Sequence, residues 1–304
     1  MSRTEVPAGQ AQEQEMRSGV VYATTAYLIY GAMPIYMKQL QAVPPGQIMA
    51  HRVIWSVVLL AIIVSFVRRW DTLRRRLSLR LVGLFAVTAM LIGTNWLVYI
   101  WAVLQNHVLE TSLGFFITPL MTVLLGVATL GERLSRLQAI AVGIAAVGVV
   151  ALALGQAGSL WIALVLAATF STAGLIRKIV QLDPLCGLLV ETSLLAPFAI
   201  AWLWLASDHG LPVFGTDAVD NFFLVSTGVV TAVPLLLFSV AAKKMPYSLV
   251  GQFQYIGPSL QFLQAVLLFH EPFGLLHVFT FGCIWTGLAF FTFDALRGQR
   301  APGA

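Results

Sequence analysis

Long apolar stretches separated by short polar segments run along almost the whole of this 304-residue chain. Ten such stretches can be placed, each with about 20 mainly apolar residues, enough for one α-helix across a hydrocarbon core of about 30 Å. A strand edge or a loop facing lipid would leave backbone amides unpaired, so a helix is the expected form of each span. The expected spans are residues 19–38, 46–67, 81–104, 108–130, 135–154, 158–177, 185–206, 220–242, 246–269 and 274–296.

The composition predicts an all-α integral membrane protein. Hydrophobic residues make up 59% of the chain and charged residues 10%, whereas about a quarter of a soluble domain is charged. The net charge of +5 does not indicate nucleic acid, because the basic residues lie between apolar spans, where they face anionic lipid head groups. We therefore expect membrane lipids, and no nucleic acid, among the partners.

The distribution of Lys and Arg predicts the orientation in the membrane. Of the 18 basic residues, only Lys38 falls on one side and only Arg52 inside a span. Because cytoplasmic loops carry the excess of Lys and Arg, both termini should be cytoplasmic. The residues on that side are Arg3, Arg17, Arg68, Arg69, Arg74, Arg75, Arg76, Arg80, Arg133, Arg136, Arg177, Lys178, Lys243, Lys244, Arg297 and Arg300.

Scarce residue types recur at a nearly constant spacing. Like residues 139 or 140 positions apart are Pro119 and Pro258, Glu132 and Glu271, Lys38 and Lys178, Gln41 and Gln181, and Pro44 and Pro184. A unit of five spans that is duplicated inserts its second copy upside down, as in many secondary transporters. We expect ten transmembrane helices as two inverted five-helix repeats, with a disordered cytoplasmic tail (1–17), the repeats at 18–155 and 156–296, and a second cytoplasmic tail (297–304).

Ionisable residues inside spans are costly and need a partner or a wet cavity. Arg52 and Glu110 are expected at similar depths and therefore as an ion pair, and Glu191 is expected to meet Arg177 or Lys178. Each charge has two open interpretations. It can bind substrate or gate the path, or it can be part of a salt bridge that fixes helix packing.

Polar and aromatic residues at helical spacing predict a cavity suited to neutral or zwitterionic amphiphiles. The alternative for each residue is an interhelical hydrogen bond, which contributes about 0.6 kcal/mol. Prolines within spans predict kinks that are either hinges or static bends. The candidate substrate or gating residues are Arg52, Asn95, Tyr99, Glu110, Gln252, Tyr255, Tyr27 and Tyr30, and the candidate hinges are Pro119, Pro234 and Pro258.

The sequence contains no motif of metal binding or catalysis. There is no HxxxH, HExxH, GxSxG or Walker pattern and no pair of catalytic carboxylates, and Cys186 and Cys283 lie in apolar spans without metal-binding spacing. We therefore expect no metal, no cofactor and no enzymatic activity.

Several sequence runs, among them MAHRVIWS, NWLVYIWAV and QYIGPSLQFL, closely resemble the RarD family of the drug/metabolite transporter superfamily. The resemblance extends from Tyr27 to Trp285. It implies a bacterial EamA-type protein of ten helices in two repeats, located in the plasma (inner) membrane. Such proteins export small metabolites or drugs through a central cavity, and RarD-like proteins are commonly labelled chloramphenicol permeases.

The leading expectation is a secondary transporter of a small molecule that works by alternating access. The alternatives are a non-transporting intramembrane enzyme, such as an acyl or isoprenoid transferase, and a membrane scaffold. An enzyme should show a convergent acid/base or nucleophile set, and a channel should favour rings of like residues in an oligomer. Substrate, direction, coupling ion and oligomeric state, including a homodimer, stay open at this point.

Overall fold

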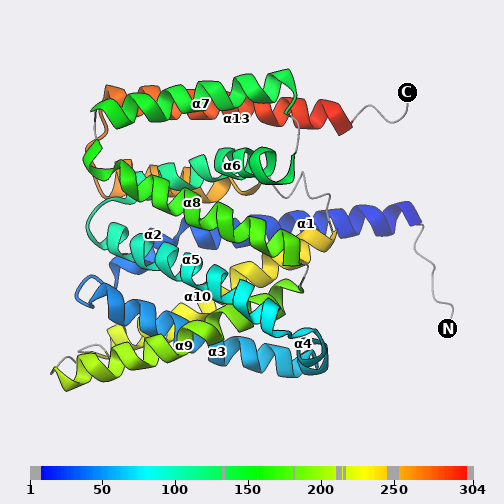
Figure 1. The fold of residues 1–304 in the computed structure, drawn as a ribbon. Helices are drawn as coiled ribbons and strands as arrows, with labels where there is room; N and C mark the ends of the chain where they lie inside the picture. Colours follow the sequence, from blue (N-terminus) through cyan, green and yellow to red (C-terminus); the bar gives the residue numbers. More distant parts are fainter. Residues whose placement is uncertain are drawn as a thin grey trace.

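The structure is a computed structural model that describes residues 8–131, 134–155, 157–180, 182–209, 214, 217–244 and 253–299. Within these residues every regular element is helical (Figure 1). The elements are α1 (Ala8–Gly31), α2 (Met33–Lys38), α3 (Pro45–Phe66), α4 (Trp70–Arg76), α5 (Leu79–Leu104), α6 (Val108–Leu130), α7 (Arg136–Gly155), α8 (Ala157–Val180), α9 (Pro184–Asp208), α10 (Ala218–Lys244), α12 (Ile256–Leu263), the π-helical turn η1 (Gln264–Leu268) and α13 (Leu275–Gln299).

Seven helices in the described part of the chain are long and apolar enough to cross a membrane. They are Gln14–Lys38, Pro45–Phe66, Leu79–Leu104, Val108–Thr129, Gly158–Arg177, Pro184–Asp208 and Ala218–Phe238. Three further apolar helices are shorter: Arg136–Leu152, Ile256–Leu268 and Leu275–Phe290. Together they correspond in position to the ten expected spans. Part of the ninth span, residues 246–252, lies outside the described residues.

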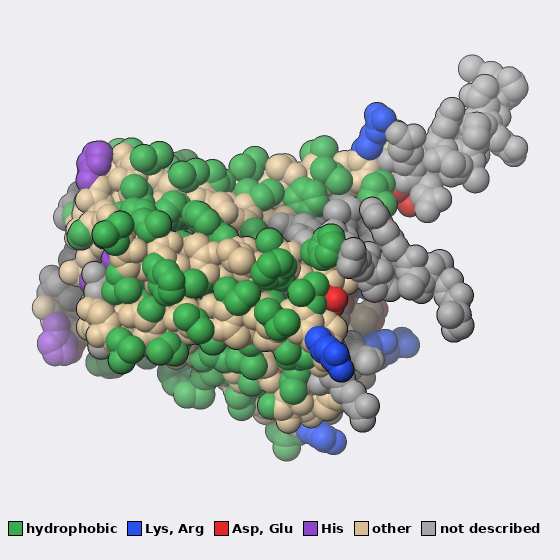
Figure 2. Space-filling model, turned by 90° about the horizontal axis from the view of Figure 1, so that it is seen from above, with side chains coloured by type: hydrophobic (Ala, Val, Ile, Leu, Met, Phe, Trp, Pro, Cys, Tyr) green, Lys and Arg blue, Asp and Glu red, His purple; other side chains and the backbone are tan. Residues whose placement is uncertain are grey.

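The surface has the polarity of a protein surrounded by lipid. Figure 2 shows one face covered largely by hydrophobic side chains, with Lys and Arg gathered at one end and His at the opposite end. Figure 1 shows that α1 begins and α13 ends at the same end of the bundle. This arrangement agrees with the charge asymmetry expected from the sequence.

The helices pack in pairs that join the two halves of the chain. α7 packs along α13, α6 packs against α8 and α12, and α5 packs against α8 and α9. α3 contacts α9 and α10, and α1 contacts α10 and α12. The first half is therefore held largely by helices of the second half.

Glycines allow the closest helix crossings. A Cβ on Gly228 of α10 would lie 2.5 Å from the carbonyl carbon of Trp55 in α3, and a Cβ on Gly287 of α13 would lie 2.6 Å from the carbonyl oxygen of Ala141 in α7. Small residues of this kind let membrane helices approach closely and gain van der Waals contact. The α3–α10 crossing depends on such a glycine.

The helix boundaries differ from the sequence expectation at three places. α1 begins at Ala8, inside the expected tail, because its Ala, Gln and Glu residues favour helix. The first span breaks after Gly31 and resumes as α2, where Pro34 occupies the first turn. α13 continues to Gln299, three residues beyond the expected end of the last span.

The three prolines proposed as hinges occupy two kinds of position. Pro119 and Pro234 lie inside the continuous helices α6 and α10. Pro258 lies in the first turn of α12, where a missing N–H removes no intrahelical hydrogen bond. In the described part of the ninth span, α12 begins two residues before Pro258 and is followed by the wider η1 turn.

We predict that Gly228→Ala lowers the thermal unfolding temperature of the detergent-solubilised protein, because the added methyl meets the Trp55 backbone. Gly83→Ala in α5 is the matched control, since no atom lies within 4 Å of the place that its methyl group would take and Ala favours helix over Gly by about 1 kcal/mol. Equal unfolding temperatures for the two variants would contradict the packing described for α3 and α10.

Candidate functional site

Arg52 is a buried positive charge on α3. Arg52 is 4% exposed, and its Cζ lies 4.4 Å from the ring centroid of Trp96 in α5. Nε and Nη1 have no hydrogen-bond partner among the described residues. A desolvated cation–π contact contributes about 2 kcal/mol, whereas burying a charge costs several kcal/mol. The guanidinium therefore keeps unused donor capacity in a place where water is scarce.

Hydroxyl groups are found next to Arg52 along both helices. Ser56 follows Arg52 by one turn of α3, and Tyr99 follows Trp96 by three residues of α5. The Ser56 Oγ and the Tyr99 hydroxyl are buried and have no hydrogen-bond partner in the part of the chain that the structure describes. Ser56 is therefore on the same face of α3 as Arg52, and Tyr99 lies within electrostatic range of the guanidinium. We call Arg52, Trp96 and the hydroxyl groups around them the Arg52 cluster.

Two further tyrosines approach Arg52 from α1 and α2. The hydroxyls of Tyr30 and Tyr36 lie within electrostatic range of the guanidinium, as does that of Tyr99. Tyr36 donates to the Phe223 carbonyl, and its oxygen lies 2.8 Å from the Ser226 Oγ in α10. The Arg52 cluster therefore brings together α1, α2, α3 and α5, and through Tyr36 it contacts α10 of the second half.

The break after α1 is covered by amide side chains from the second half. Gln261 donates from Nε2 to the Tyr30 carbonyl at 3.0 Å, and Gln264 donates to the Gly31 carbonyl at 2.7 Å. The Oε1 atoms of both glutamines are buried without a partner. Unsatisfied acceptors thus lie beside Tyr30, which itself approaches Arg52.

Several predicted cavity residues have specific partners. Asn95 donates from Nδ2 to the Leu166 carbonyl and to the Thr169 Oγ1, each at 2.9 Å, and so joins α5 to α8. The Tyr27 ring contacts Tyr30 and Phe238, with both centroid distances 6.1 Å.

Tyr255, another residue of the predicted set, is the N-cap residue of α12. The Tyr255 ring stacks on Phe116 with centroids 6.5 Å apart. Gln252 lies outside the described residues.

The expected Arg52–Glu110 ion pair is not formed in this structure. Glu110 is in the first turn of α6, and its Oε1 lies 3.4 Å from the His107 Nδ1, one turn earlier in the chain. Arg52 instead faces the Trp96 ring. A similar depth in the membrane did not place the two charges on facing surfaces of their helices.

Glu191 forms one of the expected pairs. Its carboxylate accepts hydrogen bonds from Arg177 Nε at 2.9 Å and from Arg177 Nη2 at 2.5 Å, and Thr88 donates to it at 2.8 Å. Since Glu191 is 1% exposed, this two-point pairing satisfies a deeply buried charge. Lys178, the alternative partner, has a side chain outside the described part of the structure.

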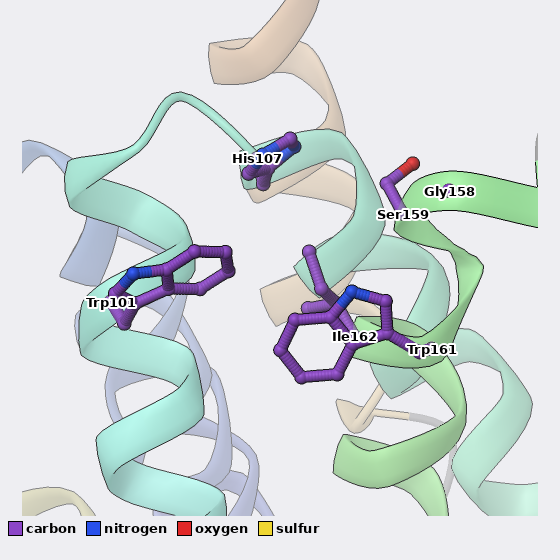
Figure 3. Close-up of a pocket in the computed structure, with 6 residues that line it drawn as sticks. All are labelled: Trp101, His107, Gly158, Ser159, Trp161 and Ile162. Carbon is purple, nitrogen blue, oxygen red and sulfur yellow. The ribbon is translucent and has the colours of Figure 1, made fainter.

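A separate cavity of about 390 Å³ lies at the end of the bundle where α6 and α8 begin. Figure 3 shows Trp101 on one helix and Trp161 on another flanking this cavity, with His107 close to Trp101. The Trp101 and Trp161 centroids are 5.6 Å apart, and Trp101 stacks on His107 at 5.8 Å. This aromatic cavity does not include Arg52.

Glu271 caps a helix of the opposite half. Its Oε1 accepts from the Val108 N–H at 2.8 Å and its Oε2 from the Leu109 N–H at 2.7 Å. The side chain of His107, the local N-cap residue of α6, makes no capping hydrogen bond to the backbone N–H groups of the helix. A carboxylate at a helix N-terminus accepts hydrogen bonds from the free N–H groups and is attracted to the positive end of the helix dipole. Glu271 therefore stabilises the start of α6, although it lies more than 160 residues later in the sequence.

Three contributors to the Arg52 cluster, Tyr36, Ser56 and Trp96, were absent from the sequence-based set. Ser56 could have been found because it lies four residues after Arg52, on the same helix face. Trp96 had no comparable signal, because an aromatic residue in an apolar span can face lipid, the protein core or a cation.

We predict that Glu271 makes stability depend on pH. Burial raises its pKa to about 7, although hydrogen bonds from Leu109 and Val108 act in the opposite direction. Between the ordinary carboxyl pKa and about 7 the folded state binds more protons at this group than the unfolded state, so stability should fall as pH rises through this window. Wild-type protein should therefore unfold at a higher temperature at about pH 6 than at about pH 8, and Glu271→Gln should reduce this difference. Identical pH dependence in both proteins would contradict the assignment.

Comparisons with known proteins agree with one another. The model of the EamA-like transporter family matches residues 17–154. An uncharacterized transporter of Vibrio cholerae is 44% identical over 292 residues, which cover 95% of this chain and 96% of the relative. Protein RarD of Escherichia coli is 42% identical over 290 residues, covering 94% of this chain and 98% of the relative.

More distant proteins also match over nearly the whole length of this chain. The chloramphenicol-sensitive protein RarD of Pseudomonas aeruginosa is 33% identical over 288 residues, covering 93% of this chain and 96% of the relative. A solved crystal structure with 17% identity covers 92% of this chain and 98% of its own, with a TM-score of 0.59, which shows a similar fold. The chain is a multi-pass bacterial membrane transporter that belongs to the RarD family of EamA-type proteins in the drug/metabolite transporter superfamily.

Proposed function

We propose that this protein is a secondary transporter that exports small amphiphilic metabolites or drugs by alternating access, with a substrate site centred on Arg52. The observation that carries the proposal is the buried guanidinium with two unpaired nitrogens, Nε and Nη1. An ionisable group inside a membrane protein that lacks a structural partner indicates a substrate or ion path. Tyr30, Tyr99 and Ser56 supply the polar surroundings such a site needs.

Ten transmembrane helices in two inverted repeats, at 18–155 and 156–296, are part of the same proposal. If α1, α3, α5, α6 and α7 are equivalent to α8, α9, α10, α12 and α13, each main helix contact between the halves has an equivalent contact. The α1–α10 contact corresponds to α8–α5, α1–α12 to α8–α6, and α3–α10 to α9–α5. The contacts α3–α9, α6–α12 and α7–α13 would lie on the axis. The EamA match to residues 17–154 supports a unit of this length.

The proposed orientation places both termini in the cytoplasm and the protein in the plasma (inner) membrane. The support is the gathering of Lys and Arg at the end of the bundle where α1 begins and α13 ends (Figures 1 and 2). An export direction would then carry substrate from the basic end toward the end that holds the aromatic cavity.

The substrate class rests on the lining and on one relative. Tyr30, Tyr99 and Trp96 give the site aromatic surface next to hydrogen-bonding groups, which suits an amphiphile. The Pseudomonas aeruginosa relative is named as chloramphenicol-sensitive, and a chloramphenicol-type compound is therefore one proposed substrate. Other relatives are named as transporters, which supports a carrier and not an intramembrane enzyme or scaffold.

The proposal is tested by reconstitution in liposomes with a panel of amino acids, nucleosides and amphenicols, with and without an imposed pH gradient. Arg52→Gln should lower the flux of any transported compound by about tenfold or more, because the lost charge contact is expected to contribute at least about 1.4 kcal/mol. Thr129→Ala, on the exposed side of α6, is the matched control and should retain flux. Parental flux in a correctly inserted Arg52→Gln protein would remove Arg52 from the site.

A further inference from the structure

The charge of Arg52 is not balanced within the described part of the chain. There Glu110 contacts His107 and Glu191 pairs with Arg177, and neither contact includes Arg52. Trp96 and the surrounding tyrosine hydroxyls offer only partial negative charge. A buried cation without a counter-charge is unfavourable by several kcal/mol, which a bound anion would offset.

The equivalent position in the second half provides an internal comparison. Glu191 lies 139 residues after Arg52, the same spacing that separates Pro119 from Pro258. Glu191 is also buried, but its carboxylate has Arg177 and Thr88 as partners. One half of the protein therefore neutralises its buried charge internally, while the other half leaves an opposite charge available.

The donors around Arg52 suit an oxyanion. Nε and Nη1 of the guanidinium lack acceptors, and the hydroxyls of Ser56 and Tyr99 can each donate one hydrogen bond. Glu110, the acid expected to oppose Arg52, contacts His107 instead. An arginine N–H group without an acceptor favours an anionic oxygen, because a charge-assisted hydrogen bond is about twice as strong as a neutral one.

We propose that the transported molecule carries a carboxylate or a comparable organic oxyanion, which binds to Arg52 with help from Tyr99 and Ser56. The aromatic face of Trp96 and the rings of Tyr30 and Tyr99 favour an apolar or aromatic body attached to that anion. A cationic amphiphile is excluded from the same position by repulsion. This proposal adds the charge of the substrate to the proposed transport function, and it rests on that function.

The test compares three probes of nearly equal size with purified wild-type protein in detergent: phenylacetate, neutral phenylacetamide and cationic phenethylamine. A charge-assisted contact should make phenylacetate bind about tenfold to a hundredfold more tightly than phenylacetamide, with phenethylamine the weakest. Arg52→Gln should abolish the preference for the acid. Equal binding of acid and amide, a preference for the amine, or no binding of the acid would overturn the proposal.

Two variants separate binding from structure. Tyr99→Phe removes a hydroxyl that has no partner, so it should weaken phenylacetate binding severalfold without lowering the unfolding temperature of the ligand-free protein. Arg52→Met should raise that temperature, because it removes an unpaired buried charge at similar volume. A lower unfolding temperature in both variants, with phenylacetate binding unchanged in Tyr99→Phe, would assign these residues to packing alone.

An inorganic anion is the other source of this chemistry. Chloride at the concentration of phenylacetate should displace little of it, and displacement by chloride at equal concentration would overturn the organic anion. Transport is scored separately in liposomes. Charge-selective binding without flux of any compound would contradict only the proposed transport, whereas flux of the amide equal to that of the acid would contradict only the anion.

Discussion

Hydrocarbon offers no hydrogen-bond partner to a backbone amide, and this constraint accounts for the form of the whole bundle. Long helices satisfy their own backbone hydrogen bonds, so the backbone groups that need other partners are at the helix ends. The break after Gly31 and the start of α6 at Val108 are two such places. In both, the missing partners come from one stretch of the second half, through Gln261, Gln264 and Glu271. The halves are thus joined by backbone hydrogen bonding as well as by apolar packing.

The same constraint makes Arg52 unusual. Glu191 and Asn95 are buried as deeply, and each has hydrogen-bond partners that explain how it is tolerated. Arg52 has an aromatic ring on one side and unfilled donors on Nε and Nη1. A protein that can satisfy Glu191 with Arg177 is able to build a closed pair. The open guanidinium is therefore better explained by an external partner than by a failure of packing.

Hydropathy and charge were sufficient to predict helices at the ten expected positions and the basic end of the bundle. They could not predict the break after Gly31, because it depends on carbonyls that Gln261 and Gln264 cover from about 230 residues away. Depth along a helix was a poor guide to partners. Arg52 and Glu110 were expected to meet, but the direction in which each side chain leaves its helix depends on packing that a single sequence does not contain.

The candidate site residues also differ in how far the sequence could predict their roles. Arg52 was found because a charge in an apolar span is rare, and that signal needs no tertiary information. Asn95 was found by the same rule, yet it bonds to α8, since a polar residue at helical spacing fits an interhelical hydrogen bond as well as a cavity. Sequence can locate polar groups in a membrane span, but only their partners separate a structural role from a binding role.

The equivalent contacts of the two halves differ in chemistry, and this bears on a carrier that alternates between two states. Between α1 and α12, Gln261 reaches a backbone carbonyl at 3.0 Å. At the equivalent position 139 residues earlier, Thr122 meets Ser171 between α6 and α8 at 3.2 Å, through short hydroxyl groups. Ser171 also donates to the Thr118 carbonyl at 3.0 Å, so the α6–α8 crossing uses short hydroxyl donors where the α1–α12 crossing uses long amide side chains, and different energies are expected. The two closed states of such a carrier would therefore be unequally populated without substrate, and differential binding of substrate would have to offset that difference.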